Sequence, residues 1–398
     1  MNIWIFNHYA KTPDFSSGTR HFDMAKELIE KGHKVTIFAS SFTHYDKKEN
    51  IIYKNGQRFL IEYIDGIRFV WIKTFKYNGG LKRIFNMFSY YINAKKASRK
   101  LQINRPEIVI GSTVHLLAAL LGKKVAKKNQ AKFFFEERDF WPQTFIDFNI
   151  LSKNNPISLI LFRVEKSLYN SADKIIVLFD RADQYVMNKG VRAEKIIYLP
   201  NGITRKVPKY SYEIEKIMME YKNKKTIIYT GSHGEANELF KVIYLAEIMS
   251  DYKDIVFLLF GEGNQKKNLI NYVRKHNIQN VIFHDSVKKH QIPFLLSKCD
   301  VSIISIKDSP LYNFGFSMNK IYDYLYAGLP LIMLTNPKLA ESFDRTGIFI
   351  SDDLDFQKNN ILQLFKDDDF YTLSSKSTKE LSEKFLWENQ IEKLDNSF

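Results

Sequence analysis

The strongest constraint on this chain is a regular alternation between short apolar runs and stretches whose apolar residues recur with the period of a helix. Short apolar runs bounded by polar loops predict buried strands, and the 3.6-residue period predicts helices between them. This order predicts parallel sheets that carry helices on both faces. Because the alternation occurs in two successive blocks and 398 residues exceed what one core holds, we predict two doubly wound α/β domains.

The predicted elements follow the same order in both halves. In the first half we predict strands at 2–6, 35–39, 68–72, 108–112, 132–136, 174–178 and 196–199, and helices near 19–31, 82–102, 115–129, 157–171 and 180–189. In the second half we predict strands at 226–229, 255–260, 281–283, 301–306, 331–334 and 348–350, and helices near 210–225, 236–250, 265–276, 288–297, 317–327, 338–344 and 355–366.

The domain boundary is predicted at Asn201-Gly202, where a polar, proline-containing stretch begins. The predicted domains are residues 1–203 and 204–368. The final segment, 369–398, is polar with a helical period, and it is predicted either to stay on the second domain or to cross back to the first.

Charge is concentrated in the first half. Residues 1–200 contain 33 Lys+Arg and 18 Asp+Glu, whereas residues 201–398 contain 26 of each, so the net charge of +15 precedes residue 201. This asymmetry predicts an anionic partner, such as a membrane surface, a lipid diphosphate or nucleic acid, unless it reflects a lysine-rich genome. A single cysteine, no apolar run of about 18 residues and no recognisable signal peptide together predict a cytoplasmic protein.

The stretch 310–333 combines the features of an anion-binding helix start. An apolar strand leads through a glycine-containing loop into a helix predicted to begin near Ser317 and to end at Gly328. Backbone N–H groups at such a start, with the Lys320 ammonium beside them, suit a diphosphate, and Asp323 one turn later can bind ribose hydroxyls. A nucleotide-sugar site is therefore indicated, with an ordinary amphipathic helix as the alternative.

Two glycine-containing loops follow neighbouring strands of the second half. The first runs from Tyr229 to Asn237, and its glycines either allow a phosphate to approach the backbone or form a tight turn with an Asn cap. The second, Gly261-Glu262-Gly263, suits a flat base or a ribose lying against the backbone.

The first half offers two further candidate segments. The polar loop 7–20 brings Gly18 and Thr19 to a helix start, and its His8 and Arg20 are candidate site residues, with His8 either catalytic or structural. The segment FFFEERDFWP places four charged residues at the carboxyl end of a strand, namely Glu136, Glu137, Arg138 and Asp139. A carboxylate there can orient or deprotonate an acceptor hydroxyl, or it forms an ion pair with Arg138.

Helix 82–102 carries an apolar side flanked by basic residues. The apolar residues are Ile84, Phe85, Phe88, Tyr91 and Ile92, and the basic residues are Lys82, Arg83, Lys95, Lys96, Arg99 and Lys100. This pattern suits an anionic bilayer surface, although the same apolar side can instead pack onto the sheet.

Taken in order, these segments resemble the retaining glycosyltransferases of family 4. The resemblance is carried by Gly32-His33-Lys34-Val35, Glu137–Pro142, Ala172-Asp173, Glu194–Ile196, Pro200-Asn201-Gly202, Gly231–Gly234, Gly261–Gly263, Asn319–Tyr324 and Ala327–Pro330. The segments at 138–142 and 319–324 resemble the branch that adds amino sugars, such as N-acetylfucosamine, to bacterial surface polysaccharides. The resemblance implies the GT-B fold, in which two Rossmann-like domains face a central cleft.

The resemblance also implies a reaction and its residues. A UDP-sugar is the expected donor, and a lipid-linked or glycan acceptor at the inner membrane face is the expected partner, with no nucleic acid. The predicted donor-binding residues are Gly18, Thr19, Gly231, Ser232, His233, Gly234, Gly261, Glu262, Phe283, Ser317, Met318, Asn319, Lys320 and Asp323. The predicted catalytic or acceptor-facing residues are His8, Glu137, Arg138 and Asp139. Neither a catalytic metal nor another cofactor is expected, because dipoles and side chains neutralise the leaving diphosphate.

The sequence departs from the family pattern in two places. The family's two glutamates are separated by seven positions, but Asp323 replaces the second and Gly315 replaces the first. The basic residue common beside the first glycine loop is also missing, and Lys241 or Lys307 is a possible substitute. Two other functions stay open from the residues alone, a UDP-sugar 2-epimerase on the same fold and a non-enzymatic basic binding protein.

Overall fold

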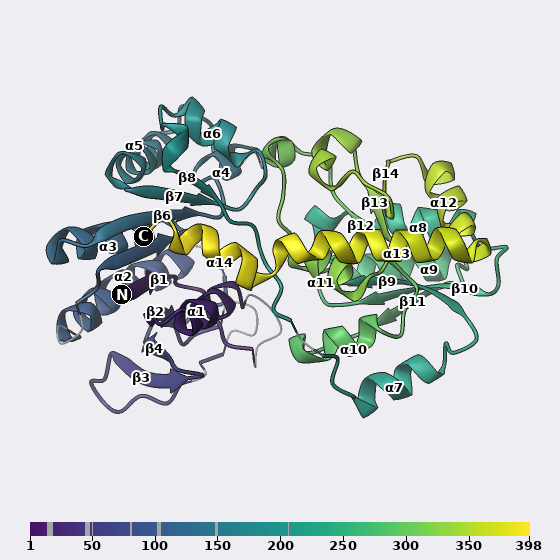
Figure 1. Ribbon diagram of the computed structural model, residues 1–398, viewed down its shortest axis with the longest axis horizontal. Coiled ribbons are helices and arrows are strands. Elements are labelled where there is room, and N and C mark those ends of the chain that lie inside the picture. The colour runs from purple at the N-terminus through teal and green to yellow at the C-terminus, as the bar shows by residue number, and fades with distance from the viewer. Residues whose placement is uncertain are drawn as a thin grey trace. The chain divides into compact units, whose positions relative to one another are not determined.

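The computed structural model describes residues 1–13, 19–43, 48–49, 51–79, 82–101, 105–147, 150–205 and 207–398. The chain forms two compact units (Figure 1). The first contains the described residues up to Pro200 together with Gln390–Phe398, and the second contains Asn201–Asn389. Gly18, a predicted donor-binding residue, lies outside the described residues.

The first unit is built on an eight-stranded sheet in the order β3-β4-β2-β1-β5-β6-β7-β8. Its strands are β1 (Asn2–Phe6), β2 (Lys34–Ser40), β3 (Phe59–Ile64), β4 (Ile67–Ile72), β5 (Ile108–Ser112), β6 (Lys132–Glu137), β7 (Lys174–Val177) and β8 (Ile196–Tyr198). Its helices are α1 (Arg20–Glu30), α2 (Lys82–Lys100), α3 (Leu116–Asn129), α4 (Gln143–Asp147), α5 (Pro156–Ser171) and α6 (Ala182–Asn188).

The second unit is built on a six-stranded parallel sheet in the order β11-β10-β9-β12-β13-β14. Its strands are β9 (Lys225–Thr230), β10 (Ile255–Phe260), β11 (Val281–His284), β12 (Val301–Ser305), β13 (Leu331–Leu334) and β14 (Ile348–Ile350). Its helices are α7 (Tyr212–Met219), α8 (Phe240–Ile248), α9 (Lys266–Lys275), α10 (Ile292–Leu296), α11 (Asn319–Ala327), α12 (Leu354–Lys366) and α13 (Asp368–Ser382), and α14 (Trp387–Asp395) continues into the first unit.

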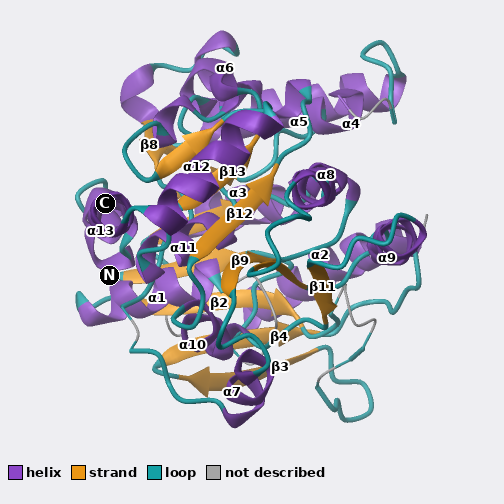
Figure 2. Cartoon of the chain, turned by 90° about the vertical axis from the view of Figure 1, so that its right-hand side faces the viewer, coloured by secondary structure: helices purple, strands orange, loops and turns teal. Residues whose placement is uncertain are grey.

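Helices flank the strands of both sheets, as Figure 2 shows. In the second unit, neighbouring residues of one strand belong to different apolar clusters. Ile228 and Leu258 pack in one cluster, whereas Ile227 and Phe257 pack in the other. Successive side chains of a strand point to opposite faces, so both faces of this sheet are covered, as the continuous apolar strands predict.

One strand of the first unit was not predicted from the sequence. Strand β3 pairs antiparallel with β4, and Asp65 and Gly66 connect the two with φ angles of 48° and 79°. Two residues with positive φ form the type I′ turn that Asp-Gly favours, so a local signal was present. The predicted helix 338–344 is also wrong, because two short 3₁₀ turns, Pro337–Leu339 and Glu341–Phe343, occupy it.

No helix in the described part of the chain combines the length and the apolar character needed to cross a bilayer.

Candidate functional site

The ammonium of Lys320 lies at the start of α11, against the loop that follows β9. Its Nζ donates to the Tyr229 hydroxyl at 2.9 Å and to Asn237 Oδ1 at 2.6 Å, and it lies 4.4 Å from the centre of the Tyr229 ring. An ammonium has three N–H donors, so these contacts leave one for a ligand. Helix α11 begins at Asn319 without a side-chain cap, so its backbone N–H groups add positive potential at the same place.

Burial lowers the pKa of Lys320 to about 7, well below the usual value for a lysine. The residue as a whole is half-buried, and the effect arises because its ammonium end is enclosed by the β9 loop. An approaching anion stabilises the protonated form, so this position favours a ligand such as a diphosphate.

The two predicted glycine loops pack backbone against backbone. Gly231 N donates to Phe260 O at 2.9 Å, and His233 N donates to Glu262 O at 2.9 Å. Gly261 has a φ of 154°, and a Cβ on it would lie 1.8 Å from the Gly231 carbonyl oxygen. The second loop was predicted to border a base or a ribose, but its first glycine is required by this loop packing.

Ser232 and His233, two further predicted residues of the first loop, hold the residues that contact Lys320 or pack beside them. The Ser232 carbonyl accepts from both the Tyr229 hydroxyl and Asn237 Nδ2. His233 is fully buried with its ring 5.9 Å from that of Phe283, and neither of its ring nitrogens has a hydrogen-bond partner among the described residues. Burial lowers the pKa of His233 to about 4, so its ring is neutral.

The charged predicted residues near these loops are held in ion pairs. Asp323, one turn after Lys320, accepts from Lys289 Nζ at 2.7 and 2.5 Å. Glu262 pairs with Lys266 at 2.6 Å. Lys289 belongs to no motif, so its contact with Asp323 could not be predicted from local sequence. Asp323 is therefore held by a cation, which fixes the orientation of the carboxylate proposed to bind ribose.

The loop ahead of α11 is fixed from the start of the second unit. Asn201 donates from its backbone N to Ser317 Oγ at 2.9 Å and from Nδ2 to Ser317 O at 2.7 Å. Met318 packs against the apolar core of the second unit and occupies the N-cap position of α11, and Gly234 precedes the short 3₁₀ turn Glu235–Asn237. Of the two proposed substitutes for the missing basic residue, Lys241 pairs with Glu238 and Asp352, so it is engaged elsewhere.

The first unit has its own buried polar cluster at the carboxyl ends of its strands. Glu136 accepts from Arg20 Nε at 2.8 Å, and its second oxygen lies 2.6 Å from His21 Nε2. Burial alone would raise the pKa of Glu136, but the facing His21 and Arg20 hold it well below its usual range. Arg20 also donates to the carbonyls of Leu199 and Pro200, so this arginine ties α1 to the end of the first unit. An ion pair is thus present at this strand end, but among the described residues it joins Glu136 to Arg20 and does not include Arg138.

The predicted catalytic residues of the first unit are spread over different environments. Glu137 is buried, accepts from the Tyr169 hydroxyl, and has its pKa raised by burial and by Glu165, so it is turned into the interior. The backbone N of Arg138 donates to Thr113 Oγ1 at 2.8 Å, and burial raises the pKa of Asp139.

His8 and Thr19 also have partners within the first unit. His8 is buried, with Nδ1 2.8 Å from His115 Nε2 and its ring stacked on Tyr90. Thr19 donates to Asp23 at 2.6 Å at the start of α1. Both side chains are thus part of the local packing. Within the described residues, no group of three or more His, Cys, Asp or Glu side chains is placed to hold a metal ion.

Two family models match the chain, one for each half. The model described as Glycosyltransferase Family 4 matches residues 18–206, and the model described as Glycosyl transferases group 1 matches residues 212–381. The first match covers the polar cluster around Glu136, and the second covers the glycine loops, Lys320 and Asp323.

Individual relatives agree with these models. The chain is 22% identical over 294 residues, 71% of each chain, to WcaI of Escherichia coli K12, which is assigned as a colanic acid biosynthesis glycosyl transferase. It is 20% identical over 279 residues, 68% of this chain and 66% of the relative, to WbjE of Pseudomonas aeruginosa, which is assigned as a glycosyltransferase. Among solved structures, HepE of Anabaena in complex with UDP-glucose has a TM-score of 0.68 at 14% identity, with 100% of both chains covered. At 14% identity, the likeness to HepE shows a shared fold and does not by itself establish the ligand of this chain.

Proposed function

The chain belongs to glycosyltransferase family 4, and from this premise we propose that it transfers a sugar from a UDP-sugar to a lipid-linked or glycan acceptor in surface polysaccharide synthesis. The GT-B fold implied by the resemblance is confirmed by the two parallel-sheet units and by the full-length likeness to HepE. The non-enzymatic alternative does not fit this family membership.

The observation that carries the donor proposal is the surroundings of Lys320. A desolvated ammonium with one remaining donor lies between an uncapped helix start and a glycine loop. This combination suits the diphosphate of a nucleotide-sugar, and Asp323 lies one turn further along the same helix to accept from ribose hydroxyls. The UDP-glucose complex of HepE supports a uridine nucleotide as the carrier.

The chemistry follows from where negative charge develops. When the bond between sugar and diphosphate breaks, charge builds on the diphosphate, and Lys320 with the α11 backbone N–H groups stabilises it. We propose that these groups replace a metal in neutralising the leaving group. The resemblance at 138–142 and 319–324 supports a retaining transfer and an N-acetylated amino sugar.

The acceptor proposal comes from the relatives and from charge. WcaI is assigned to colanic acid biosynthesis, which supports a glycan acceptor or a lipid-linked precursor. The net charge of +15 carried by residues 1–200 supports work at an anionic membrane face.

The proposal is tested by titrating the protein calorimetrically with a panel of UDP-sugars and then supplying lipid-linked glycan acceptors. We expect binding at Lys320 to weaken in Lys320→Met and to stay unchanged in Lys267→Met, an exposed lysine on α9. Formation of a free sugar or a 2-epimer without acceptor would point to epimerisation. Equal binding by both variants would remove the basis of the donor proposal.

A further inference from the structure

Helix α2 presents an apolar stripe to solvent. Ile84, Phe85, Phe88 and Ile92 are 47%, 63%, 51% and 48% exposed. The opposite side of the helix does the packing, with Met87, Tyr90, Ala94 and Ala97 buried. The possibility that the apolar stripe packs onto the sheet is therefore wrong, and four large apolar side chains on one helix face are left in water.

The same helix face continues into basic residues. Phe85, Phe88, Ile92, Lys96 and Arg99 follow one another at spacings of three and four, so they share one side of α2. Lys96 and Arg99, with Lys100, form one wall of a pocket of about 780 Å³, and the opposite wall is the segment Gly56–Ile61 that leads into and begins β3. The exposed face of α2 therefore passes from an apolar half to a cationic pocket.

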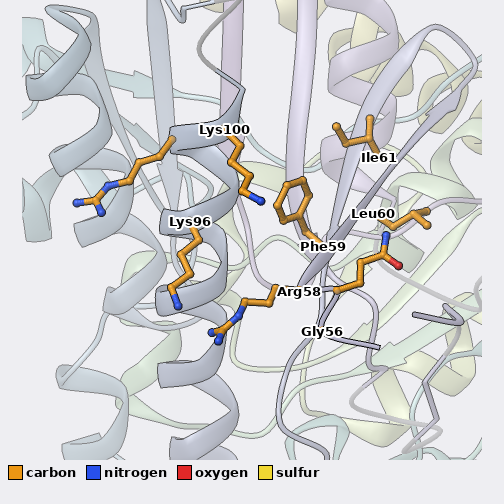
Figure 3. Close-up of a pocket in the computed structure, with 9 residues that line it drawn as sticks. Gly56, Arg58, Phe59, Leu60, Ile61, Lys96 and Lys100 are labelled. Carbon is orange, nitrogen blue, oxygen red and sulfur yellow. The ribbon is translucent and has the colours of Figure 1, made fainter. Parts of the chain in front are cut away.

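Figure 3 shows how the cations of this pocket are arranged. The side chains of Arg58 and Lys96 end close to each other, and Lys100 points toward Phe59, its Nζ 5.9 Å from the ring centre. The residues that line the pocket include no Asp or Glu. In the described part of the chain none of Arg58, Lys96, Arg99 and Lys100 takes part in an ion pair. Several like charges around one space favour an anion in it.

The β3 side of the pocket extends the apolar surface. Phe59, Ile61 and Tyr63 alternate along β3, so they lie on one face of this edge strand. Ile61 is 40% and Tyr63 is 69% exposed. Phe75, whose ring lies 6.2 Å from that of Phe85, is also exposed. Apolar side chains thus adjoin the cationic pocket on β3 as well as on α2.

We propose that the exposed face of α2 and the pocket beside β3 dock the enzyme on an anionic phospholipid bilayer, with a lipid phosphate in the pocket. Phe85, Phe88 and Ile92 enter the boundary between headgroups and acyl chains, while Arg58 and Lys96 bind the phosphate. A bilayer with anionic lipids offers acyl chains to the apolar side chains of α2 and phosphates to the cationic pocket. A nucleic acid would match the charges and leave the apolar side chains in water.

This inference adds a location to the proposed function, because a lipid-linked acceptor is presented at such a surface. Binding to vesicles needs neither donor nor acceptor, so it can fail while UDP-sugar binding succeeds, and the reverse also holds. The two proposals are therefore separately testable.

The test is sedimentation of the full chain with vesicles of phosphatidylcholine, with and without phosphatidylglycerol. We expect binding only to the anionic vesicles and weaker binding as salt rises. The double variant Lys96→Gln with Arg99→Gln is expected to bind about 30-fold less, at about fivefold for each basic residue near the surface. The matched control Lys267→Gln with Arg274→Gln removes equal charge from exposed positions of α9 and should bind as the wild type.

The apolar half is tested by Phe85→Ser with Phe88→Ser, which should lose most vesicle binding. Phe356→Ser, at a position 48% exposed on α12, is its control and should not change it. Unchanged melting temperature and UDP affinity of the α2 variants show that they are folded. The proposal would be overturned if the wild type bound neutral vesicles equally well, or if the α2 variants bound vesicles like the wild type. It would also be overturned if the wild type bound no vesicles but formed a dimer that the Phe variants abolish.

Discussion

Donor affinity is expected to fall as the pH rises above 7, because the Lys320 ammonium loses its proton. Burial sets the pKa of this group to about 7 in the folded protein without ligand, against about 10.4 in an unfolded chain. A bound diphosphate stabilises the ammonium, so binding above pH 7 takes up a proton from solution.

The size of this effect follows from the pKa. If only the ammonium form binds, the dissociation constant rises about tenfold from pH 6 to pH 8 and about 100-fold from pH 6 to pH 9. Lys320→Met loses a charge-assisted contact of about 1.5–3 kcal/mol, which weakens binding about 10- to 150-fold, and its pH profile should be flat. Lys320→Arg keeps its charge throughout, so its profile should be flat as well.

The measurement is isothermal titration with UDP-glucose between pH 6 and pH 9. This ligand is preferred to UDP because its diphosphate diester keeps a constant charge over the range. Two buffers with different ionisation enthalpies at each pH count the protons taken up. A flat wild-type profile, or a slope retained by Lys320→Met, would refute the role given to this ammonium.

Stability supplies an independent check on the same pKa. The folded state holds fewer protons on Lys320 than the unfolded state between about pH 7 and pH 10, so the free energy of unfolding should rise with pH in this range. Lys320→Met should remove that part of the rise, measured by urea unfolding at pH 7 and pH 9.

Three further outcomes are expected. Asp323→Ala should weaken UDP binding about tenfold and abolish any preference for UDP over 2′-deoxy-UDP in calorimetry, because we propose that its carboxylate, oriented by Lys289, accepts from the ribose hydroxyls. A preserved preference would place the ribose elsewhere. Gly261→Ala should destabilise the protein by about 3 kcal/mol or more in urea unfolding, since the added Cβ would clash with the Gly231 carbonyl oxygen. The control Gly190→Ala, at a φ of 88° with open space around the added Cβ, should cost about 1 kcal/mol. Glu136→Gln should cost about 3–5 kcal/mol by leaving Arg20 buried without its carboxylate. Because the folded pKa of Glu136 lies below its unfolded value of about 4.3, this cost should be constant from pH 8 to pH 5 and should shrink as the pH falls further.

Most of the fold could be predicted because it is encoded by neighbouring residues. Ile255–Phe260 and Leu331–Leu334 are continuous apolar runs, and the observed strands have the predicted limits. Strand β3 was missed because it lies at the sheet edge, where Glu62 and Tyr63 are exposed and the apolar run is interrupted. Helix α2 was located correctly, but its sequence did not show which side faces the sheet.

The candidate site was predicted only in part. Lys320 and Asp323 could be singled out from the sequence because both belong to one helix start, whereas their partners come from other elements. Tyr229 contacts Lys320 from strand β9, Asn237 contacts it from the loop that follows, and Lys289 contacts Asp323 from 34 positions away. The glycines of the second loop were assigned to ligand contact, although the close approach of Gly231 explains Gly261.

The sequence by itself determined the mainly parallel α/β organisation, most of the strands and helices, and the helix start near Lys320, because periodicity and helix-end chemistry depend on residues a few positions apart. The tertiary structure decided which charges are paired and which surfaces stay exposed. Arg20 meets Glu136 across 116 positions, and the apolar side of α2 is left in water. Both outcomes depend on which strands lie side by side in the sheet, and that order brings together side chains that no local pattern connects.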